Sequence, residues 1–422
     1  MNTARWIWVA TVVVAAVMPW FFHDYHTGRD SGFVISMLSQ TGLMVILALS
    51  YNMLLGQAGL FSLCHATFFG IGGYATVHFL NAAGAGDLPI PMELVPLLSG
   101  LSGLGLAIVF GFMAKKQRAT AFAMITLGIG ELTATSALMF HHFFGGEGGV
   151  TTNRMIENSL FGLSYASGLQ VYYLILVWAL LSAGAMYFLT QTPLGRMANA
   201  TRDNFERAQF MGYDPRVVRF LQFCLSGFFA GIGGGLYAIT YEIVTFDAVA
   251  APLSANALLM AYIGGTTVFG GPILGAVVIT LLQSGVSLLS NSWLVYVGVL
   301  FISMVMFAPA GLSGLIIAHR PIVAAGRFRR LTVPYLRLAI PFLALVLGFV
   351  GLVELLSFLT IGAAQGKKLV LFGNAIDVAA VQPWSISVVC LFGGGTWLRI
   401  EARLFHRVWE SLTADLKQVD RS

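Results

Sequence analysis

The sequence predicts an all-α fold: a polytopic transmembrane helical bundle with about ten core spans and two further spans at the C-terminal end. Three observations support this class. Of the 422 residues, 57% are hydrophobic and only 10% are charged, whereas soluble domains carry about 25% charged residues. Apolar runs of about 20 residues, the length that crosses a bilayer core, recur along the chain. The 48 glycines and 32 phenylalanines suit helices that pack through small residues and expose aromatic ones to lipid.

The apolar runs give the expected spans in order. The first run has no small-residue cleavage motif after its apolar core, so we expect it to remain as a span. To within a few residues, we expect spans at 5–23, 33–55, 64–82, 94–113, 119–142, 169–190, 216–240, 254–270, 272–290, 292–310, 334–357 and 381–398.

The character of the chain changes after Pro309. Residues 1–316 read as one glycine-rich core, and residues 317–333 as a basic cytoplasmic linker. Residues 334–398 supply two more spans. Residues 399–422 form an amphipathic tail of the kind that lies on a membrane surface. We therefore expect a ten-span core with a separate C-terminal extension.

Basic residues gather at the ends of spans, which the positive-inside rule assigns to the cytoplasm. The clusters alternate correctly if both termini are cytoplasmic, except that Lys367 and Lys368 then lie outside. Since the net charge of +5 reflects this topology, we expect no nucleic-acid partner. The agreeing clusters are Lys115, Lys116 and Arg118; the stretch 192–219; His319, Arg320, Arg327, Arg329, Arg330 and Arg337; and Arg399, Arg403 and Arg407.

The sequence shows no pattern for catalysis or cofactor binding. The three cysteines lie in apolar runs without metal-ligand spacing. A phosphate-binding loop needs G-x-x-x-x-G-K-[ST], and the nearest stretch, Gly362 to Lys368, has the wrong spacing. No Ser-His-Asp set, H-E-x-x-H or C-x-x-C motif occurs. We expect a non-catalytic membrane protein that binds no cofactor or metal of its own.

A charged island, residues 195–214, lies between two apolar runs. Pro193 ends the preceding span, and a short helix follows. Gly212 stands where a left-handed C-terminal cap belongs, and Asp214-Pro215 is a typical helix start. We interpret the island as a docking site for a soluble partner, although an ordinary cytoplasmic loop is the simpler alternative. Its candidate docking residues are Arg196, Arg202, Asp203, Asn204, Glu206, Arg207, Ala208 and Gly212.

The span that follows the island carries Gly227, Gly231 and Gly235, each four residues apart. Residues at this spacing share one helix face. Glycine there lets a neighbouring helix approach closely. We therefore expect this face to be a helix-packing ridge.

Polar residues interrupt two apolar stretches in the first half of the chain. Asn52, Gln57, Ser62 and His65 surround a glycine-bearing break, which is typical of backbone that lines a transport pathway. Hydrogen bonding between helices is the structural alternative, and for His65 alone it is the favoured one. Thr126 and Glu131 lie in a later span. Glu131 is consistent with substrate contact, with a structural pair or helix break, or with proton coupling.

A third candidate stretch is Ala255–Ala276, which includes Gly264 and Gly265. It reads as two short helices joined at Gly270-Gly271-Pro272, with pure packing as the alternative. The glycine-rich loop 144–154 reads as an external mouth.

Several of these segments, in the same order, resemble those of branched-chain amino acid ABC permeases. The island carries R-D-N-x-x-R-A-x-x-x-G-Y at 202–213, the polar break carries Q-A-G-L-F-S-L-C-H at 57–65, and 119–131 and 264–276 also match. Cys64 and Thr267 stand where the family has glycine. The resemblance covers about residues 30 to 315 and points to the larger, LivM-like permease subunit.

The resemblance implies a non-catalytic half of an importer in the bacterial inner membrane. Its expected partners are a second homologous permease, two ATPase subunits, a periplasmic substrate-binding protein and membrane lipid. ATP would bind the ATPase subunits and not this chain. The island would be the coupling segment. The rival hypotheses are a stand-alone secondary transporter that uses Glu131 or Glu242 for proton coupling, and a membrane-embedded structural subunit.

Overall fold

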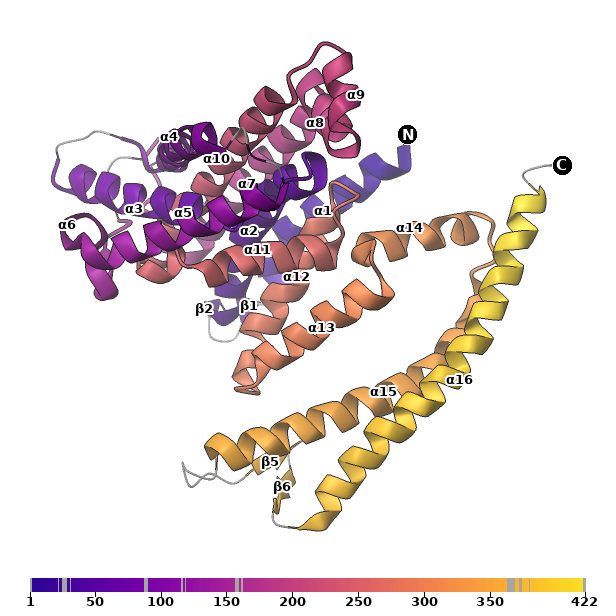
Figure 1. The fold of residues 1–422 in the computed structure, drawn as a ribbon. Helices are drawn as coiled ribbons and strands as arrows, with labels where there is room; N and C mark the ends of the chain where they lie inside the picture. The colour runs from indigo at the N-terminus through magenta and orange to yellow at the C-terminus, as the bar shows by residue number, and fades with distance from the viewer. Residues whose placement is uncertain are drawn as a thin grey trace. The chain divides into compact units, whose positions relative to one another are not determined.

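The computed structural model describes residues 2–21, 23–24, 29–30, 32–86, 90–114, 117, 119–155, 159–160, 162–362, 369–371, 374–378 and 380–419. The chain forms two compact units (Figure 1). Unit 1 comprises Met1–Ser284 and Phe301–Ser313, and unit 2 comprises Gly285–Leu300 and Gly314–Ser422. The predicted domain boundaries stay a prediction, and the two units are described separately below.

Unit 1 is helical, with three short helical turns and two short antiparallel ribbons, β1–β2 and β3–β4. Its elements are α1 (Asn2–Phe21), β1 (His23–Asp24), β2 (Arg29–Asp30), α2 (Gly32–Asn52), a π-helix (Met53–Gln57), α3 (His65–Gly84), a 3-10 turn (Met92–Leu94), α4 (Val95–Ala114), α5 (Ala119–Met139), α6 (His141–Phe144), a 3-10 turn (Gly146–Gly148), β3 (Val150–Thr151), α7 (Gly168–Gln191), α8 (Pro193–Asp203), α9 (Phe205–Phe210), α10 (Pro215–Tyr241), β4 (Ile243–Val244), a 3-10 turn (Phe246–Ala248), α11 (Ala251–Gly264) and α12 (Gly271–Ser284).

The remaining elements follow residue 284. They are a 3-10 turn (Val286–Leu288), α13 (Trp293–Phe307), α14 (Gly311–Ala324), α15 (Arg329–Ser357), a π-helix (Phe358–Gly362), β5 (Leu369–Leu371), β6 (Asn374–Ile376) and α16 (Val381–Val419).

The all-α transmembrane class is confirmed. Within the described residues, eight helices are long and apolar enough to cross a membrane, or nine if α13 and α14 form one bent span. This is fewer than the expected twelve, although helices occupy all of the expected positions. Neither α3 nor α16 reaches the required apolarity, because α3 carries buried polar groups and the apolar half of α16 runs into Arg399 and Arg403.

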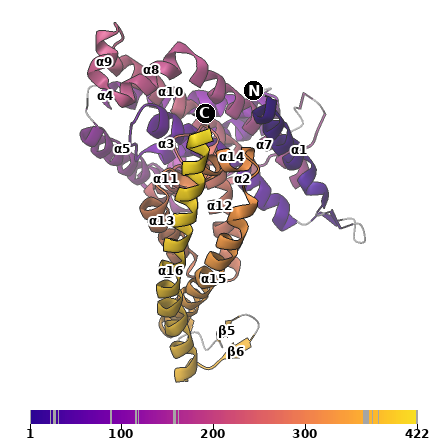
Figure 2. The same cartoon turned by 90° about the vertical axis from the view of Figure 1, so that its right-hand side faces the viewer.

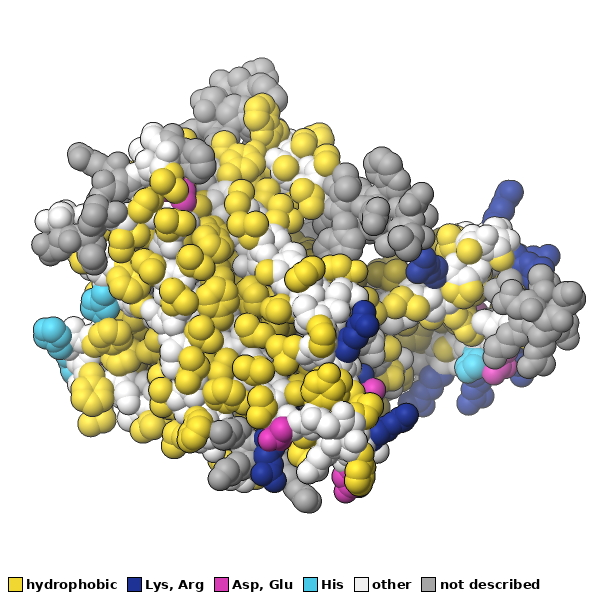
Figure 3. All heavy atoms as spheres, turned by 90° about the horizontal axis from the view of Figure 1, so that it is seen from above, with side chains coloured by type: hydrophobic (Ala, Val, Ile, Leu, Met, Phe, Trp, Pro, Cys, Tyr) yellow, Lys and Arg dark blue, Asp and Glu magenta, His cyan; other side chains and the backbone are white. Residues whose placement is uncertain are grey.

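The centre of unit 1 is α10, which packs mainly against α4, α3 and α2. In the most apolar window of α10, 78% of the residues are buried. Figure 3 shows that hydrophobic side chains cover much of the visible surface of the helices around it. Such a surface is expected where lipid is the solvent, so α10 serves as the core around which unit 1 is built.

The glycine ridge explains why α10 can lie at the centre. A Cβ atom at Gly231 would lie 2.6 Å from the carbonyl oxygen of Ser99 on α4. One at Gly227 would lie 2.5 Å from the Cβ of Ala107, also on α4, and one at Gly235 would overlap the side chain of Ser99. Because only glycine leaves this space, the backbones of α10 and α4 approach directly, and the expected ridge is present.

In unit 2, α15 and α16 run side by side as an antiparallel pair, linked through the β5–β6 ribbon (Figure 2). Gly348 and Gly394 lie at the contact. Most of the stretch expected as a linker is helical, because α14 extends to Ala324 and α15 begins at Arg329. The expected separate tail is the continuation of α16, since neither glycine nor proline occurs between Arg399 and Val419.

Candidate functional site

The first helical break of unit 1 separates α2 from α3. After Asn52 the chain forms the π-helix, and residues 58–64 are non-helical. Gly59 has a φ of +64°, which favours glycine, and the Leu60 amide donates to the carbonyl oxygen of Leu54 at 2.9 Å. π-helical turns of this kind are frequent at functional sites. The polar break expected from the sequence is thus a real interruption of the helix.

A second break separates α11 from α12. Gly265 has a φ of +100°, and the joint runs over residues 265–270. It therefore begins earlier than the expected Gly270-Gly271-Pro272 turn, because Gly264 already ends α11 against the start of α12. The backbone at Gly311 is packed directly on Gly265. Glycine at these positions lets three backbone segments meet.

The two breaks contact each other. A Cβ atom at Gly56 would lie 2.7 Å from the carbonyl oxygen of Thr266. Gly56 belongs to the first break and Thr266 to the second, and α2 and α12 pack along each other beside them. Two stretches some 210 residues apart in sequence are thereby joined into one interrupted region of backbone, which we call the break junction (Gly56–Cys64 and Gly264–Gly271).

The charged island forms two short helices, α8 and α9, where the sequence suggested one. Asn204 has an extended conformation, and its side chain accepts a hydrogen bond from the Arg207 amide at 2.9 Å, so it ends α8 and caps α9. Gly212 has a φ of +87°, as its expected capping position requires. Asp214 accepts from the Arg216 amide at 2.9 Å and starts α10.

Most of the predicted docking residues lie on the surface of this island. Arg196, Asp203, Asn204, Glu206, Arg207 and Gly212 are exposed, whereas Ala208 is buried. Sequence reasoning missed Phe210, whose side chain is 90% exposed at the end of α9, together with the exposed Met211 and Tyr213. An apolar group surrounded by charges at the tip of a polar island is typical of a protein-docking surface.

Arg202 behaves differently from its neighbours. Its Nη1 donates to the carbonyl oxygen of Gly56, and its Nε donates to Asp203 at 2.9 Å. Its Cγ would lie 2.7 Å from a Cβ atom at Gly59. The island is therefore tied to the break junction through one arginine that bonds the backbone at the end of the π-helix.

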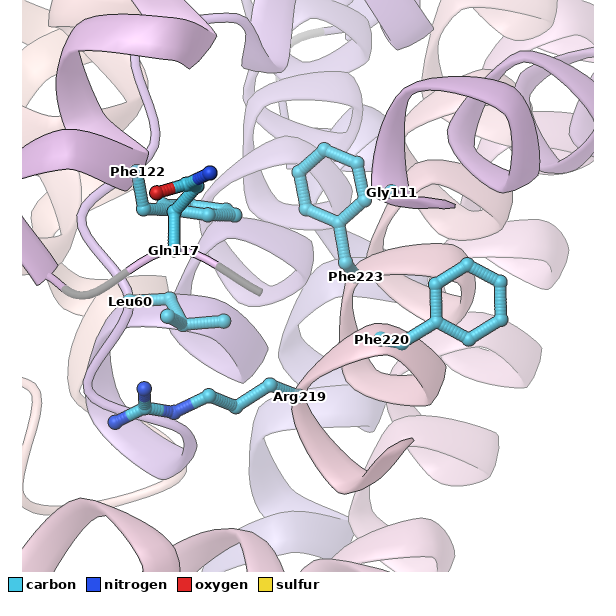
Figure 4. A pocket seen from close by; sticks show the side chains of 7 residues that line it. All are labelled: Leu60, Gly111, Gln117, Phe122, Arg219, Phe220 and Phe223. Atoms are coloured by element: carbon cyan, nitrogen blue, oxygen red, sulfur yellow. The ribbon is translucent and has the colours of Figure 1, made fainter. Parts of the chain in front are cut away.

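Arg219 makes a second connection, which the sequence did not single out. Its guanidinium carbon lies 5.0 Å from the ring centroid of Phe205 on α9, a cation–π contact. The same side chain lines a small pocket with Leu60 of the first break, together with Gly111, Gln117, Phe122, Phe220 and Phe223 (Figure 4). Figure 4 shows Arg219 reaching from α10 toward Leu60. Through Arg219, the α9 part of the island is thus linked to the same break.

The predicted pathway residues divide into three groups: those at the two breaks, those held by structural contacts near the first break, and Glu131. Asn52 and Gln57 are buried at the first break, and the Oδ1 of Asn52 and the Oε1 of Gln57 have no hydrogen-bond partner among the described residues. Gly264 and Gly265 belong to the second break. Buried polar atoms without partners are rare in folded proteins. Such atoms also occur elsewhere among the described residues, at Gln222 and Thr280 for example, so they add polar acceptors to the first break without setting it apart.

The other polar residues near the first break have structural contacts. His65 is fully buried, and its Nε2 lies 2.8 Å from the Ser50 hydroxyl, between the rings of Tyr51 and Phe68. The Ser62 carbonyl accepts from the Tyr51 hydroxyl at 3.0 Å. Thr126 Oγ1 accepts from the Leu63 amide at 3.1 Å. These contacts show what holds residues 62–65 in place and favour the structural alternative for His65, although its Nδ1 has no hydrogen-bond partner among the described residues.

Glu131 is not brought together with these residues. It lies on α5, and its side chain is exposed. Met124, Leu127, Gly128 and Leu138 are exposed at helical spacing on either side of it, so they form one unpartnered face. A carboxylate within a span is costly when it faces lipid. This face is therefore expected to meet a partner chain or water.

Outside the spans, the glycine-rich loop is held by the β3–β4 ribbon. Arg154 donates from its amide to Glu242 Oε1 at 3.0 Å, and from its guanidinium to the carbonyl oxygens of Thr240 and Ala166. Glu242 thus has a structural role. Lys115, Lys116, Arg118, Lys367 and Lys368 lie outside the described residues, so their predicted positions stay predictions.

A carboxylate that the sequence did not flag holds another loop. Glu93 accepts hydrogen bonds from Ser159 Oγ at 2.8 Å, the Leu160 amide at 3.1 Å and the Tyr165 hydroxyl at 2.9 Å. Burial, reinforced by the Glu93 carboxylate, raises the pKa of Tyr165, so its hydroxyl remains a donor.

The comparisons with known proteins agree with this architecture. Residues 33–310 match the family model described as "Branched-chain amino acid transport system / permease component". The high-affinity branched-chain amino acid transport system permease protein LivM of Escherichia coli is 25% identical over 328 residues, 72% of this chain and 73% of that protein. The fructose import permease protein FruF of Bifidobacterium longum is 25% identical over 306 residues, 67% of this chain and 80% of that protein.

More distant sugar permeases also match. The ribose import permease protein RbsC of Haemophilus influenzae is 24% identical over 299 residues, 67% of this chain and 85% of that protein. No solved structure matches the chain. The family match covers well over half of the chain and ends just before unit 2 resumes at Gly314. With its broken helices and LivM-like segments, the chain belongs to the family of branched-chain amino acid transport permease components.

Proposed function

We propose that this chain forms half of the translocation pathway of an ATP-driven importer and couples that pathway to ATPase subunits through residues 195–214. The solute is a branched-chain amino acid or a related small amino, carboxylic or amide compound. The other components are a second homologous permease, two ATPase subunits and a periplasmic binding protein. The complex lies in the bacterial inner membrane, with both termini of this chain in the cytoplasm.

The observation that carries the proposal is the hydrogen bond from Arg202 to the Gly56 carbonyl. An island that only docked a partner would need no bond to the membrane-embedded break. An island that only terminated a helix would not expose Phe210. The island both bonds the break through Arg202 and exposes Phe210 on its outer face. A segment with these two properties can transmit movement. Its outer face receives the ATPase movement, and Arg202 and Arg219 pass that movement to the break junction.

The solute pathway follows from the same arrangement. Broken helices with free backbone groups are how transporters build sites near the bilayer midplane. Asn52 and Gln57 have unpartnered acceptors at this break. The exposed face of α5 around Glu131 would pack toward the second permease, so that the substrate passes between the two chains. The Glu131 carboxylate is then available to an ammonium group.

The test separates docking from transmission. The complex is isolated through a tag on this chain, and both ATPase activity and solute uptake are measured in proteoliposomes. Arg207→Glu, Gly212→Pro and Phe210→Ser should reduce co-purification of the ATPase subunits and abolish coupled ATPase activity, while the chain stays in the membrane. The matched control is Met155→Ser, which alters an exposed apolar side chain distant from the island in sequence.

Arg202→Met should act differently, because it keeps the stem of the side chain but removes the donor to Gly56. ATPase subunits should remain bound, while uptake per ATP hydrolysed falls at least tenfold. If coupled turnover survives both Arg207→Glu and Gly212→Pro, the docking role of the island is wrong. If Arg202→Met retains full coupling, the island docks without transmitting through this bond.

The alternative is a proton-coupled transporter that acts alone, and the exposed Glu131 within α5 is the observation that favours it. Glu242 does not strengthen it, because its Oε1 already accepts a hydrogen bond from the Arg154 amide beside the β3–β4 ribbon. Reconstitution of the single chain decides between the two. Uptake driven by a proton gradient without ATPase subunits, and lost in Glu131→Gln, would replace the importer proposal.

A further inference from the structure

Unit 2 continues beyond the end of the family match at residue 310 and is built on the α15–α16 pair. The stretch of α15 and its π-helical end from Leu338 to Thr360 contains one charged residue, Glu354. At about 1.5 Å per residue it is about 34 Å long, close to the thickness of about 30 Å of a bilayer core. The membrane boundary of this helix therefore falls next to Arg337.

The Glu354 carboxylate finds its hydrogen-bond partners inside unit 2. Its Oε1 accepts hydrogen bonds from the hydroxyls of Ser290 and Tyr296, the latter at 2.5 Å. This carboxylate is thus satisfied by the segment Gly285–Leu300 of the same unit and leaves the apolar stretch intact as a span.

The register of the helix pair sets the arginines of both helices at the same end. Gly394 of α16 packs against Pro341 and Leu345 of α15, and Leu412 packs against Leu331. Arg337 therefore lies at the level of residues 399–403. On α16, Arg399, Arg403 and Arg407 are each four residues apart and share one face, as do Arg330 and Arg337, seven apart, on α15. We call this set the arginine belt: Arg329, Arg330, Arg337, Arg399, Arg403 and Arg407.

The six arginines of the belt are exposed. Among the residues that the structure describes, none of them has an ion-pair partner. Of the neighbouring acids, Glu410 pairs with His406 at 3.4 Å, and Glu401 lies 3.4 Å from Trp397 Nε1. Figure 3 shows basic side chains gathered at this end of unit 2.

A cluster of aromatic side chains holds the belt in place. His319 Nε2 bonds the hydroxyl of Tyr335, and the His319 ring meets Trp409 edge-on at 4.9 Å. Phe405 lies 4.9 Å from Tyr335. The cluster joins α14, α15 and α16, with Ile322, Leu331 and Leu412 buried beneath it. The arginines are therefore presented on a fixed scaffold at the edge of the apolar span.

From these observations we infer that the arginine belt binds the phosphate groups of anionic phospholipids in the adjacent leaflet, and so anchors unit 2 at the membrane surface. Basic clusters immediately beside a span attract anionic lipid, and guanidinium groups match phosphate geometry. Ordinary topology signals need only an excess of lysine and arginine in the loop. The belt goes further, because it places on one scaffold six guanidinium groups that have no ion-pair partner in the part of the chain that the structure describes. The inference does not depend on the transport proposal.

The test uses the full chain in detergent, with bound lipids counted by native mass spectrometry during titration with phosphatidylglycerol or phosphatidylcholine. The chain should retain phosphatidylglycerol in preference to phosphatidylcholine, and the preference should fall as salt is raised. Arg399→Gln, Arg403→Gln and Arg407→Gln together should weaken phosphatidylglycerol binding at least tenfold, since each basic residue near a membrane surface contributes roughly a fivefold effect.

Two further variants make the result decisive. The lysine triple variant at the same positions keeps the charge but not the planar guanidinium groups, so it should lose less binding than the glutamine variant and more than the unmodified chain. The control, Arg196→Gln with Arg207→Gln and Arg216→Gln, removes the same charge from unit 1 and should leave binding unchanged. Equal loss in the lysine variant, or equal loss in the control, would overturn the inference. So would normal lipid binding in the glutamine variant combined with loss of a co-purifying protein subunit, because the belt would then be a protein-docking surface.

Discussion

Two long helices of this chain, α10 in unit 1 and α15 in unit 2, differ in how much of their surface is buried. In α10, 78% of the most apolar window is buried, whereas in α15 the share is 17%. Yet the most apolar window of α15 is more hydrophobic than that of α10, which contains glycine, serine and glutamine in its span. In a bilayer the apolar solvent lies outside, so hydrophobicity does not select the interior helix. Small side chains and the ability to form hydrogen bonds decide which helix lies in the interior.

The difference extends to how each helix makes contacts. α10 meets its neighbours through glycine against backbone and through Ser226, whose hydroxyl donates to the Ser50 carbonyl at 2.9 Å. α15 meets α16 through a few glycines and otherwise exposes leucine, isoleucine and phenylalanine. Substitutions on α10 should therefore perturb the fold, while most on α15 should be absorbed by lipid or detergent.

The largest effect is expected from Gly231→Leu. A side chain at this position would meet the Ser99 carbonyl oxygen 2.6 Å from its Cβ atom, and the backbones of α10 and α4 would have to separate. We expect a loss of about 4 kcal/mol, above the usual range for overpacking, because backbone and not a flexible side chain is displaced. Size-exclusion chromatography in detergent should show little monodisperse protein. Gly393→Leu on α16, where no atom lies within 4 Å, is the matched control. Normal yield of Gly231→Leu would show that α4 is not packed directly on α10.

A smaller effect is expected from removing a buried leucine. Leu236→Ala on α10 removes a side chain with no exposed surface from the core cluster of unit 1 and should destabilise the protein by about 3 kcal/mol through the cavity it leaves. Leu343→Ala on α15, where the side chain is 58% exposed, should change stability by less than about 0.5 kcal/mol. Thermal unfolding in detergent measures both. Equal losses would mean that the interior of unit 1 is no better packed than the surface of α15.

Local signals of the sequence were enough to place the caps of the island and the glycine ridge. The caps can be predicted from a few neighbouring residues at Gly212 and Asp214. The ridge can be predicted in the same way from the repeat at Gly227 and Gly231. The contact of Arg202 with Gly56 was beyond such reasoning, because it joins positions 146 residues apart. The exposure of Phe210 is also a tertiary property. Asn204 was a missed local signal, since asparagine before a short charged run is a common N-cap.

The sequence predicts a span at 64–82, and the helix that forms there, α3, is less apolar than the eight helices that qualify as spans. α3 carries His65, Thr67 and Thr76 in a fully buried state. Partners on α2 and α4 bond His65 Nε2 and the Thr76 hydroxyl. Its sequence is therefore more polar than that of the qualifying spans, although α3 packs against α10 and α4 inside the bundle.

A moderate effect should come from the hydrogen bond inside the bundle. Ser50→Ala leaves His65 Nε2 buried without its partner, which should cost about 2 kcal/mol. Tyr296→Phe in unit 2 should cost only about 1 kcal/mol, because Glu354 is partly exposed and keeps Ser290. The double variant Ser50→Ala with His65→Phe should recover part of the loss, since both polar partners are then absent. A double variant that loses the sum of both single effects would assign His65 a role other than this bond.

The smallest effect, and the only one with a favourable sign, is expected from Gly393→Ala. This glycine lies within α16, and a Cβ atom there meets nothing within 4 Å. Replacing glycine by alanine in an open helix position should raise stability by roughly 0.5–1 kcal/mol, because the unfolded chain loses freedom that the helix does not use.

Gly348→Ala on α15 is the contrast. Its Cβ atom would lie 2.7 Å from the Ser387 carbonyl oxygen, so this substitution should be destabilising. Thermal unfolding of the two variants, first in detergent and then in the assembled complex, distinguishes open from covered surface. A stabilising Gly393→Ala in detergent that becomes destabilising in the complex would show that another subunit covers this face of α16, and the exposed character of unit 2 would then hold only for the isolated chain.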